Sequence, residues 1–381
     1  MELETVRYTY RLRPGAQAEK ALLAEWNRCR FLWNEAVHMQ RTGQKPAFAR
    51  LSRMLTEARR RTRWLRDGSQ DVQAFTLRTY SQALSHSFTV KGRGRPTFKS
   101  RKKSLPTLQY SRNGFSLNNG RLVLPKGVTV PVVWSRELPT PPTSVTVYRD
   151  SLGHWYASFV TRRETVEVPA ADGGIGIDWG VADTATTTDD RFDLPHLGHR
   201  RMCAAQLAKA QRKMSRRRRQ GTQSKGYHRA KREAAKLHKK AQRQTQHDTR
   251  VWAKQVVEQH DLIAVEDFRP RFLSKTTMAR KAADAAVGAA KRELVERGRR
   301  AGRKVVLVQP ADTTLTCSRC FARNKRLELH ERTFRCAHCE FIAGRDRNAA
   351  RVILAVAERG HTSVEGVRHP EPNCSLVSGA T

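Results

Sequence analysis

Two Cys-x-x-Cys pairs constrain the fold of residues 317–339 more than any other feature of the chain. Cys317 and Cys320 form the first pair, Cys336 and Cys339 form the second, and fifteen residues separate them. Each pair places two thiolates on one tight turn, and two such turns facing each other across a short hairpin complete a tetrahedral metal site. Because protein ligands fill all four positions, no place is left for a reacting water. The spacing therefore predicts one structural Zn²⁺.

The other cysteines and two nearby histidines do not change this interpretation. Two disulfides are the alternative for the four cysteines, but a reducing cytoplasm disfavours them. His330 and His338 are competing ligands that four thiolates make unnecessary. Cys29, Cys203 and Cys374 have no partner at ligand spacing, so we interpret them as buried or incidental thiols.

The positive charge of the chain indicates the class of its partner. Its 381 residues include 73 Lys and Arg but only 35 Asp and Glu, a formal net charge of +38. Such an excess repels itself unless a polyanion is bound, and nucleic acid is the expected polyanion. A ribosomal or histone-like protein is one alternative, which the cysteines and the long apolar segments disfavour. We expect no membrane partner, because no apolar run reaches the roughly 18 residues of a membrane helix and the N-terminus lacks a signal peptide's apolar stretch. The expected location is therefore the cytoplasm.

The basic residues are densest between Lys209 and Arg243, where fifteen Lys or Arg stand beside one acid. A solvated helical face is the usual explanation of such a run. So many unbalanced charges favour a nucleic-acid contact instead. We expect that contact to involve Arg216, Arg217, Arg218, Arg219, Lys225, Arg229, Lys231 and Arg232.

Hydrophobic patterns organise the N-terminal part of the chain. Alternation at 5–14 predicts a strand, helical spacing predicts helices between 17 and about 87, and alternation with turn signals predicts further strands up to 168. We expect residues 1–14 and 95–168 to form one β-domain, with a helical domain, 15–94, inserted in it. The basic segment 91–104, with "RGRP" at its centre, is interpreted as a loop leading into the sheet; an isolated minor-groove reader is the alternative.

The C-terminal part alternates short apolar runs with helical patterns. "GIGIDW", "DLIAVE" and "KVVLVQ" are typical of buried strands, and "ADAAVGAAKRELVERGRRAG" (283–302) indicates a helix. Gly221 and Gly226 predict a break that divides the basic segment into two helices. A last helix is expected to begin near Asp346, and residues 361–381 are expected to be disordered.

Three acidic residues occupy corresponding places in this pattern. Asp178 is near the end of the first buried strand, Glu266 ends a later strand, and Asp346 begins the last helix. Open α/β sheets bind ligands outside the carboxyl ends of their strands, so the three side chains can converge on one edge. Crowded acids would repel one another unless divalent cations were bound between them. Taken singly, each has a simpler explanation as a turn cap, an ion-pair partner or a helix cap.

The order of these motifs resembles a known nuclease family. "GIGIDWG", "IAVEDF", the four-cysteine module and "GRDRNAA" resemble, in that order, the RuvC-like nuclease of the transposon-encoded TnpB proteins and of the compact type V CRISPR effectors. The resemblance covers about residues 173–357 well and extends loosely to "YTYRLRP", "CRFLWNEAV", "RPTFKSRKKS" and "WYASF". It implies a multidomain α+β fold, in which an N-terminal β-barrel-like domain with inserted helices precedes an RNase H-like domain, 169–311 and 343–360. The zinc ribbon, 312–342, is inserted in the second domain.

The resemblance also implies an activity: RNA-guided cleavage of double-stranded DNA beside a short flanking motif, in the cytoplasm of a bacterium. A guide RNA would pair with the target, while the β-domain and its inserted helices would read the flanking motif and hold the RNA. Asp178, Glu266 and Asp346 would hold two Mg²⁺ ions for phosphodiester hydrolysis. The protein would act as a monomer or dimer on the RNA. Two alternatives are a DNA transposase or recombinase of RNase H-like fold, and a guided repressor that binds without cutting.

Overall fold

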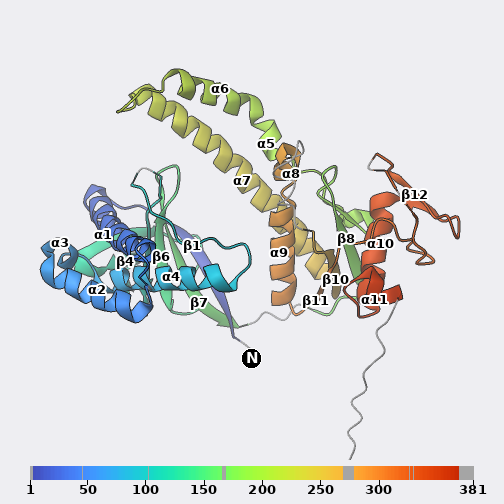
Figure 1. Cartoon of the computed structure of the whole chain (residues 1–381), viewed down its shortest axis with the longest axis horizontal. Helices are drawn as coiled ribbons and strands as arrows, with labels where there is room; N and C mark the ends of the chain where they lie inside the picture. The colour runs from blue at the N-terminus through green and yellow to red at the C-terminus, as the bar shows by residue number, and fades with distance from the viewer. Residues whose placement is uncertain are drawn as a thin grey trace, which may run out of the picture. The chain divides into compact units, whose positions relative to one another are not determined.

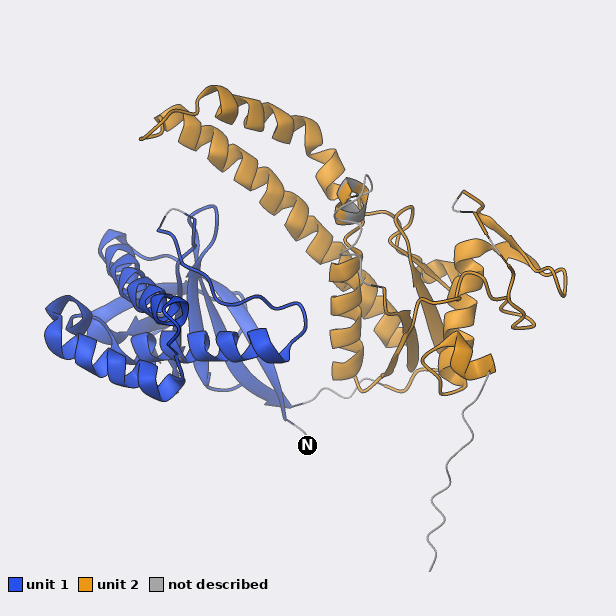
Figure 2. Ribbon diagram, in the orientation of Figure 1, with its two compact units in different colours: residues 1–164 blue, residues 165–381 orange. Residues whose placement is uncertain are grey.

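The computed structural model describes residues 3–44, 46–101, 103–164, 169–268, 279–325, 327–328 and 330–368. The chain divides into two compact units, Met1–Glu164 and Thr165–Thr381 (Figure 2). Among the helices that are described, none is both long and apolar enough to cross a membrane.

The first unit is built on a seven-stranded sheet with the order β2-β6-β7-β1-β5-β4-β3. Its strands are β1 (Leu3–Leu12), β2 (Thr107–Ser111), β3 (Ser116–Asn118), β4 (Arg121–Leu124), β5 (Val128–Val133), β6 (Ser144–Arg149) and β7 (Trp155–Glu164). Strand alternation buries Val6, Tyr10 and Leu12 and leaves Arg7 and Arg11 exposed. Leu108 of β2 and Leu122 of β4 share one core, so the sheet curves around it. In the part of the chain that is described, β2 and β3 remain edges, and the expected barrel-like domain is a curved open sheet.

Four helices follow β1 and precede β2 (Figure 1). They are α1 (Ala16–Arg41), α2 (Phe48–Arg61), α3 (Arg63–Arg66) and α4 (Gln70–Thr89). Leu22 and Trp26 of α1 pack into the core of the sheet. Further along the same helix, Leu32 and Ala36 pack with Leu77 of α4 in a second core. Because α1 contributes to both cores, it fastens the inserted helices to the sheet.

The basic segment after α4 is fixed to α1 through its backbone. The Trp33 indole donates to the Thr97 carbonyl at 2.9 Å. Asn34 accepts from the Lys99 backbone N–H at 2.8 Å and donates to the Lys99 carbonyl at 3.2 Å. The Lys99 ammonium lies 3.5 Å from the centre of the Trp33 ring, and burial lowers the pKa of Lys99 to about 8. The segment is thus anchored on a helix before it enters the sheet.

The second unit is built on a four-stranded sheet with the order β11-β10-β8-β9. Strands β8 (Gly174–Trp179), β10 (Leu262–Glu266) and β11 (Lys304–Val308) are parallel, and β9 (Ala185–Thr187) is antiparallel to β8. Parallel strands are normally covered on both faces, which explains their continuous apolar runs.

Helices cover both faces of this sheet (Figure 1). Ile175 and Ile177 of β8 share a core with residues of α7 (Lys225–Gln259) and α9 (Val287–Arg300). Ala264 of β10 shares a core with α10 (Arg345–Glu358) on the other face. A Cβ atom at Gly176 would lie 2.0 Å from the Ala350 carbonyl oxygen, so only glycine allows α10 to approach β8 this closely.

The helices differ in part from the expected pattern. The basic segment does divide into α6 (Ala204–Arg216) and α7, as the glycines predicted, after a single turn of helix α5 (His199–Met202). The helix expected at 283–302 is broken into α8 (Ala279–Ala285) and α9, because Ala286 has a left-handed backbone with φ 57°. The tail expected to be disordered from residue 361 contains α11 (Val364–Arg368), since Val364 is buried with α10. Residues 369–381 lie outside the description.

Candidate functional site

Strand alternation brings Asp178 and Glu266 to one face of the four-stranded sheet. Because Ile175 and Ile177 face α7 and α9, Asp178 points to the face that α10 covers. Glu266 shares the parity of Ala264, which packs with α10. Val265 lies opposite Ile177 in the parallel pair β8–β10. Asp178 and Glu266 are the next residues of the two strands, so the acids lie side by side at the carboxyl ends of these strands. Both side chains are buried.

Asp346 completes this group from the first turn of α10. Burial raises the pKa of Asp178 well above its ordinary value, the Glu266 and Asp346 carboxylates raise it further, and the Arg345 guanidinium opposes them. Burial raises the pKa of Glu266 to about 7, against the Trp179 backbone N–H and the Lys291 ammonium, which lower it. Asp178 therefore lies within electrostatic reach of both other acids.

The chemistry of these donors fits a hard divalent cation. Carboxylate oxygens are the ligands that Mg²⁺ prefers, and a cation between the acids would offset the repulsion that adds to the effect of burial on the pKa of Asp178. Their oxygens are more widely spread than the cysteine sulfurs. Among the described residues, only the four cysteines gather three or more candidate ligand atoms within 4.8 Å of one another. The acids thus form a group that a cation would have to draw together.

Trp179, which follows Asp178, ties the ends of the two acid-bearing strands together. Its indole N–H donates to the backbone carbonyl of Glu266 at 3.1 Å. The buried ring also packs edge-on against Trp252 of α7, with 5.9 Å between ring centres. This contact fixes the spacing of β8 and β10 where the acids emerge, and the sequence pattern did not predict it.

Arginines hold the first turn of α10. The Arg345 Nε donates to Asp346 at 3.2 Å, and Arg332 reaches the same carboxylate at 3.5 Å. Arg347 forms two hydrogen bonds to the Asp193 carboxylate, at 2.8 and 3.1 Å. Asp346 therefore stands in a helix turn that is braced on both sides, and its own side chain is 28% exposed.

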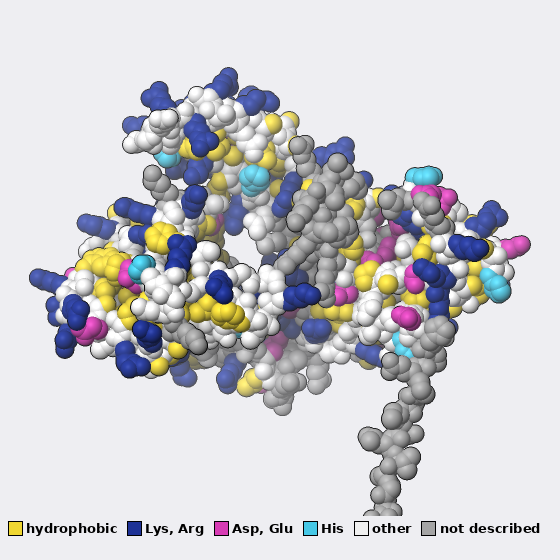
Figure 3. Space-filling view, viewed as in Figure 1, with side chains coloured by type: hydrophobic (Ala, Val, Ile, Leu, Met, Phe, Trp, Pro, Cys, Tyr) yellow, Lys and Arg dark blue, Asp and Glu magenta, His cyan; other side chains and the backbone are white. Residues whose placement is uncertain are grey.

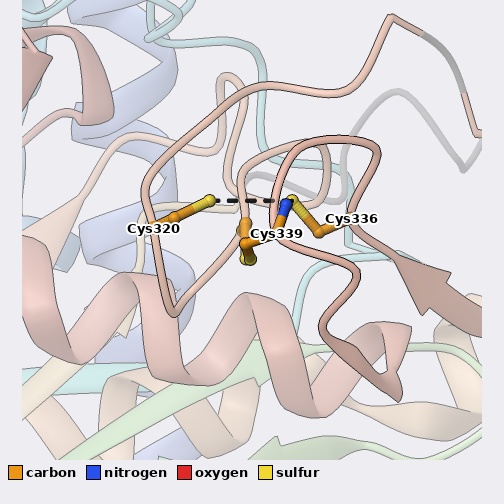
Figure 4. Close-up of side chains that lie close together, drawn as sticks. Cys320, Cys336 and Cys339 are labelled. Carbon is orange, nitrogen blue, oxygen red and sulfur yellow. Dashed lines mark hydrogen bonds between the residues drawn. The ribbon is translucent and has the colours of Figure 1, made fainter.

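The four cysteines come together as their spacing predicted. Cys317 and Cys339 Sγ lie 3.7 Å apart. Cys320 and Cys336 Sγ lie 3.6 Å apart and face each other in Figure 4. A tetrahedral site with Zn–S bonds of about 2.3 Å requires sulfurs about 3.8 Å apart, whereas a disulfide requires about 2.05 Å. The geometry fits zinc and does not fit disulfides. Neither His330 nor His338 belongs to the group.

Backbone donors prepare one of these thiols for a metal. The N–H groups of His338 and Cys339 approach Cys336 Sγ at 3.3 and 3.4 Å. Burial alone would raise the pKa of Cys336, but the two backbone donors and the neighbouring thiols lower it to about 6. Strands β12 (Thr333–Arg335) and β13 (Ile342–Gly344) form the hairpin that carries the second pair, and β13 runs directly into α10.

The expected nucleic-acid residues lie on the helical hairpin of α6 and α7. Alanines allow the two helices to pack closely, with Ala210, Ala230 and Ala234 buried. Lys and Arg side chains gather over this hairpin in the space-filling view (Figure 3). All eight of the basic residues expected to contact nucleic acid are exposed: Arg216, Arg217, Arg218, Arg219, Lys225, Arg229, Lys231 and Arg232.

The sequence of the chain is similar to those of proteins named as RNA-guided DNA endonucleases. A family model described as "Probable transposase" matches residues 158–275, and one described as "Cas12f1-like, TNB domain" matches residues 289–353. The chain is 28% identical over 374 residues to a putative RNA-guided DNA endonuclease of Streptomyces pristinaespiralis, covering 95% of this chain and 91% of the relative. It is 27% identical over 374 residues to the putative RNA-guided DNA endonuclease InsQ of Escherichia coli (strain K12), covering 91% of each.

A solved structure extends the likeness to the fold. The protein in a Cas12f1–sgRNA–target DNA complex superimposes with a TM-score of 0.52 at 14% identity, covering 92% of this chain and 98% of that one. The shared fold is a mixed α/β, multidomain one.

The purified protein is expected to contain about one zinc per chain. Cys336→Ser should lose the metal and lower the melting temperature, because structural zinc contributes on the order of 10 kcal/mol in small modules. Cys203→Ser is the control, since Cys203 is a buried thiol of the same unit outside the cluster. Elemental analysis and thermal melting check both variants. A zinc-free protein that melts like the parent contradicts the site.

The raised pKa values of Asp178 and Glu266 predict a pH-dependent response to Mg²⁺. An unfolded Glu titrates near 4.3, so the stability that the protonated Glu266 contributes to the metal-free fold declines as the pH rises from about 4.3 to about 7. A cation needs the ionised carboxylates, so it acts in the opposite direction. Mg²⁺ should raise the melting temperature at about pH 8 and have little effect at about pH 5.5. In the isosteric double variant Asp178→Asn/Glu266→Gln, the effect of Mg²⁺ on the melting temperature should be the same at both pH values. If the effect still depended on pH in this variant, Asp178 and Glu266 would not be the groups that bind Mg²⁺.

Proposed function

We propose that this TnpB-like chain, which resembles the compact type V effectors over most of its length, is an RNA-guided DNA endonuclease. The observation that carries the proposal is that the buried, mutually repelling Asp178 and Glu266 lie on one face of the sheet, and that Asp346 begins the helix that covers this face. The curated relatives named as RNA-guided DNA endonucleases support it, since the chain spans nine-tenths of each.

In this proposal the sequence of the target is read by a guide RNA. Base pairing with the guide selects the DNA strand, and the protein contributes shape and positive charge. The β-domain and its inserted helices, within residues 1–168, read a short flanking motif and hold the RNA. The exposed arginines and lysines of the α6–α7 hairpin bind phosphates of the RNA or of the heteroduplex.

The nuclease domain comprises residues 169–311 and 343–360 in this proposal, an RNase H-like domain interrupted by the zinc ribbon, 312–342. Asp178, Glu266 and Asp346 would hold two Mg²⁺ ions, which when bound activate a water and stabilise the leaving 3′ oxygen in an in-line displacement. The chain itself supplies the fixed spacing. Trp179 holds the end of β10, and Gly176 lets α10 bring Asp346 to the strands. Products should carry 5′-phosphates.

One observation favours a second candidate. The family model that covers residues 158–275 is described as a probable transposase, and the same three acids would also serve DNA strand transfer. The two functions differ in their dependence on RNA. Cleavage that requires one discrete RNA species supports the guided nuclease, and strand joining without RNA supports the transposase. A guided repressor that binds without cutting is disfavoured, because all three acids are intact.

Single replacement of the acids should abolish cleavage and spare binding. Asp178→Ala, Glu266→Ala and Asp346→Ala each remove an oxygen ligand for the metal while leaving the basic surface intact. Asp172→Ala is the control, because Asp172 is exposed and precedes the opposite end of β8. Gel assays of cleavage and of RNA and DNA binding measure both properties. Near-parental cleavage by any one of the three variants removes the triad assignment.

The arginine turn between α6 and α7 should contribute phosphate contacts. Replacing Arg216, Arg217, Arg218 and Arg219 with Gln should flatten the dependence of log affinity on log salt, since each lost contact lowers the slope by about 0.7 to 0.9. The matched control replaces the same four with Lys, which keeps the charge and should keep the slope. Binding is measured between about 50 and 200 mM salt. An unchanged slope in the Gln variant would mean that these four arginines are solvated and make no phosphate contacts.

A further inference from the structure

Asn348 makes a buried connection between the zinc ribbon and the helix of Asp346. It lies in α10, two residues after Asp346, and its side chain is fully buried. Its amide nitrogen donates to the Thr316 carbonyl at 2.7 Å, and its amide oxygen accepts from the Ser318 N–H at 2.9 Å. These two backbone groups flank Cys317. The Asn348 side chain is therefore hydrogen-bonded to the backbone on both sides of Cys317, a candidate zinc ligand.

The environment of Asn348 explains why an asparagine stands there. Asn is a poor residue for a helix interior, because its amide competes with the backbone for hydrogen bonds. Here the amide is used outside the helix, with donor and acceptor both paired to the ribbon. The helix itself therefore does not require asparagine at this position, but the contact with the zinc ribbon does.

Other links between the ribbon and this turn are weaker or more exposed. Arg332 reaches Asp346 at 3.5 Å, but the Arg332 side chain is 61% exposed, and exposed ion pairs are strongly screened. The Arg345 N–H donates to the Arg332 carbonyl at 2.8 Å and continues the hairpin into the helix. Loss of the Asn348 amide would leave two backbone groups without their partner, so this side-chain link is costly to remove.

We propose that Asn348 is a positioning residue that couples the zinc ribbon to Asp346. With zinc bound, the turn at Cys317 would present a carbonyl and an N–H at fixed positions, and Asn348 holds the first turn of α10 against these two groups. Asp346 is thereby fixed relative to Asp178 and Glu266. The inference rests on the proposed function of the three acids, and it assigns zinc an indirect role in their affinity for Mg²⁺.

The chain offers a matched control in Asn324. Asn324 also bridges backbone groups beside a zinc ligand, donating to the Arg335 carbonyl at 2.7 Å and accepting from the Ala337 N–H at 3.1 Å. Those partners flank Cys336 and lie within the ribbon. Asn348→Ala and Asn324→Ala therefore remove the same chemistry at two zinc ligands, and only the first cuts the connection to α10. Asn348→Asp keeps the acceptor for the Ser318 N–H and replaces the donor to the Thr316 carbonyl with a carboxylate oxygen.

The first test measures zinc content and the Mg²⁺ concentration for half-maximal cleavage. Asn348→Ala should keep about one zinc per chain, raise the half-saturating Mg²⁺ concentration by about tenfold or more, and recover with excess Mn²⁺; groups that orient metal ligands have effects of this size. Asn324→Ala should release zinc faster and keep the parental Mg²⁺ requirement while zinc remains bound. Parental Mg²⁺ dependence in both Asn348 variants overturns the proposal, as does loss of zinc from both.

Amide hydrogen exchange provides a readout that does not need cleavage. In the parent, removal of zinc by a chelator should accelerate exchange in the first turn of α10, residues 345–350. In Asn348→Ala that turn should exchange quickly even with zinc bound, and chelation should add nothing. If the parent does not cleave under any condition, the proposed function fails while this measurement still tests the coupling. Equal acceleration by chelation in parent and variant would contradict it.

Discussion

The close contact of α10 with β8 at Gly176 is the constraint on which the candidate site depends. A methyl group there would lie 2.0 Å from a backbone oxygen, so any other residue would force the helix away from the sheet. The contact is maintained by the apolar side of α10, where Val352, Ile353 and Val356 are fully buried. As a result, a helix that follows the zinc ribbon delivers Asp346 to an edge already occupied by two buried acids. The hydrophobic packing stabilises an arrangement that the charges oppose.

Acidic and basic side chains gather in different parts of the second unit: the acids at the edge of the sheet and the arginines on the α6–α7 hairpin. The acids that repel one another are buried at the sheet edge, where burial raises their pKa values. The arginines at the end of α6 are exposed on a helical hairpin. A net charge of +38 attracts polyanions, whereas carboxylate oxygens are the ligands that divalent cations prefer. The cysteine ribbon supports the acid site only through its contacts with α10, since protein ligands fill all four positions of its metal site.

Local patterns predicted those parts of the site that leave a periodic signal. The apolar runs that end in Asp178 and Glu266 identified two neighbouring strands, and the Cys-x-x-Cys spacing identified a tetrahedral site. The contacts that hold these parts together were not predictable in this way. The Trp179 bond to the Glu266 carbonyl and the Asn348 bonds beside Cys317 join residues 87 and about 30 positions apart. The break at Ala286 and the short helix at Val364–Arg368 follow from packing, which overrides helix propensity.

RNA-guided cleavage is tested most directly by asking whether the RNA determines where the DNA is cut. RNA that copurifies with the protein is sequenced, and its target-pairing segment is replaced with a new sequence. The protein is then reconstituted with each RNA and given linear DNA that contains both matching sites. An RNA-guided endonuclease should cut at the site that matches the RNA supplied, and the cut should disappear when RNA is omitted. Cleavage at one fixed site with either RNA, or equally without RNA, would contradict it.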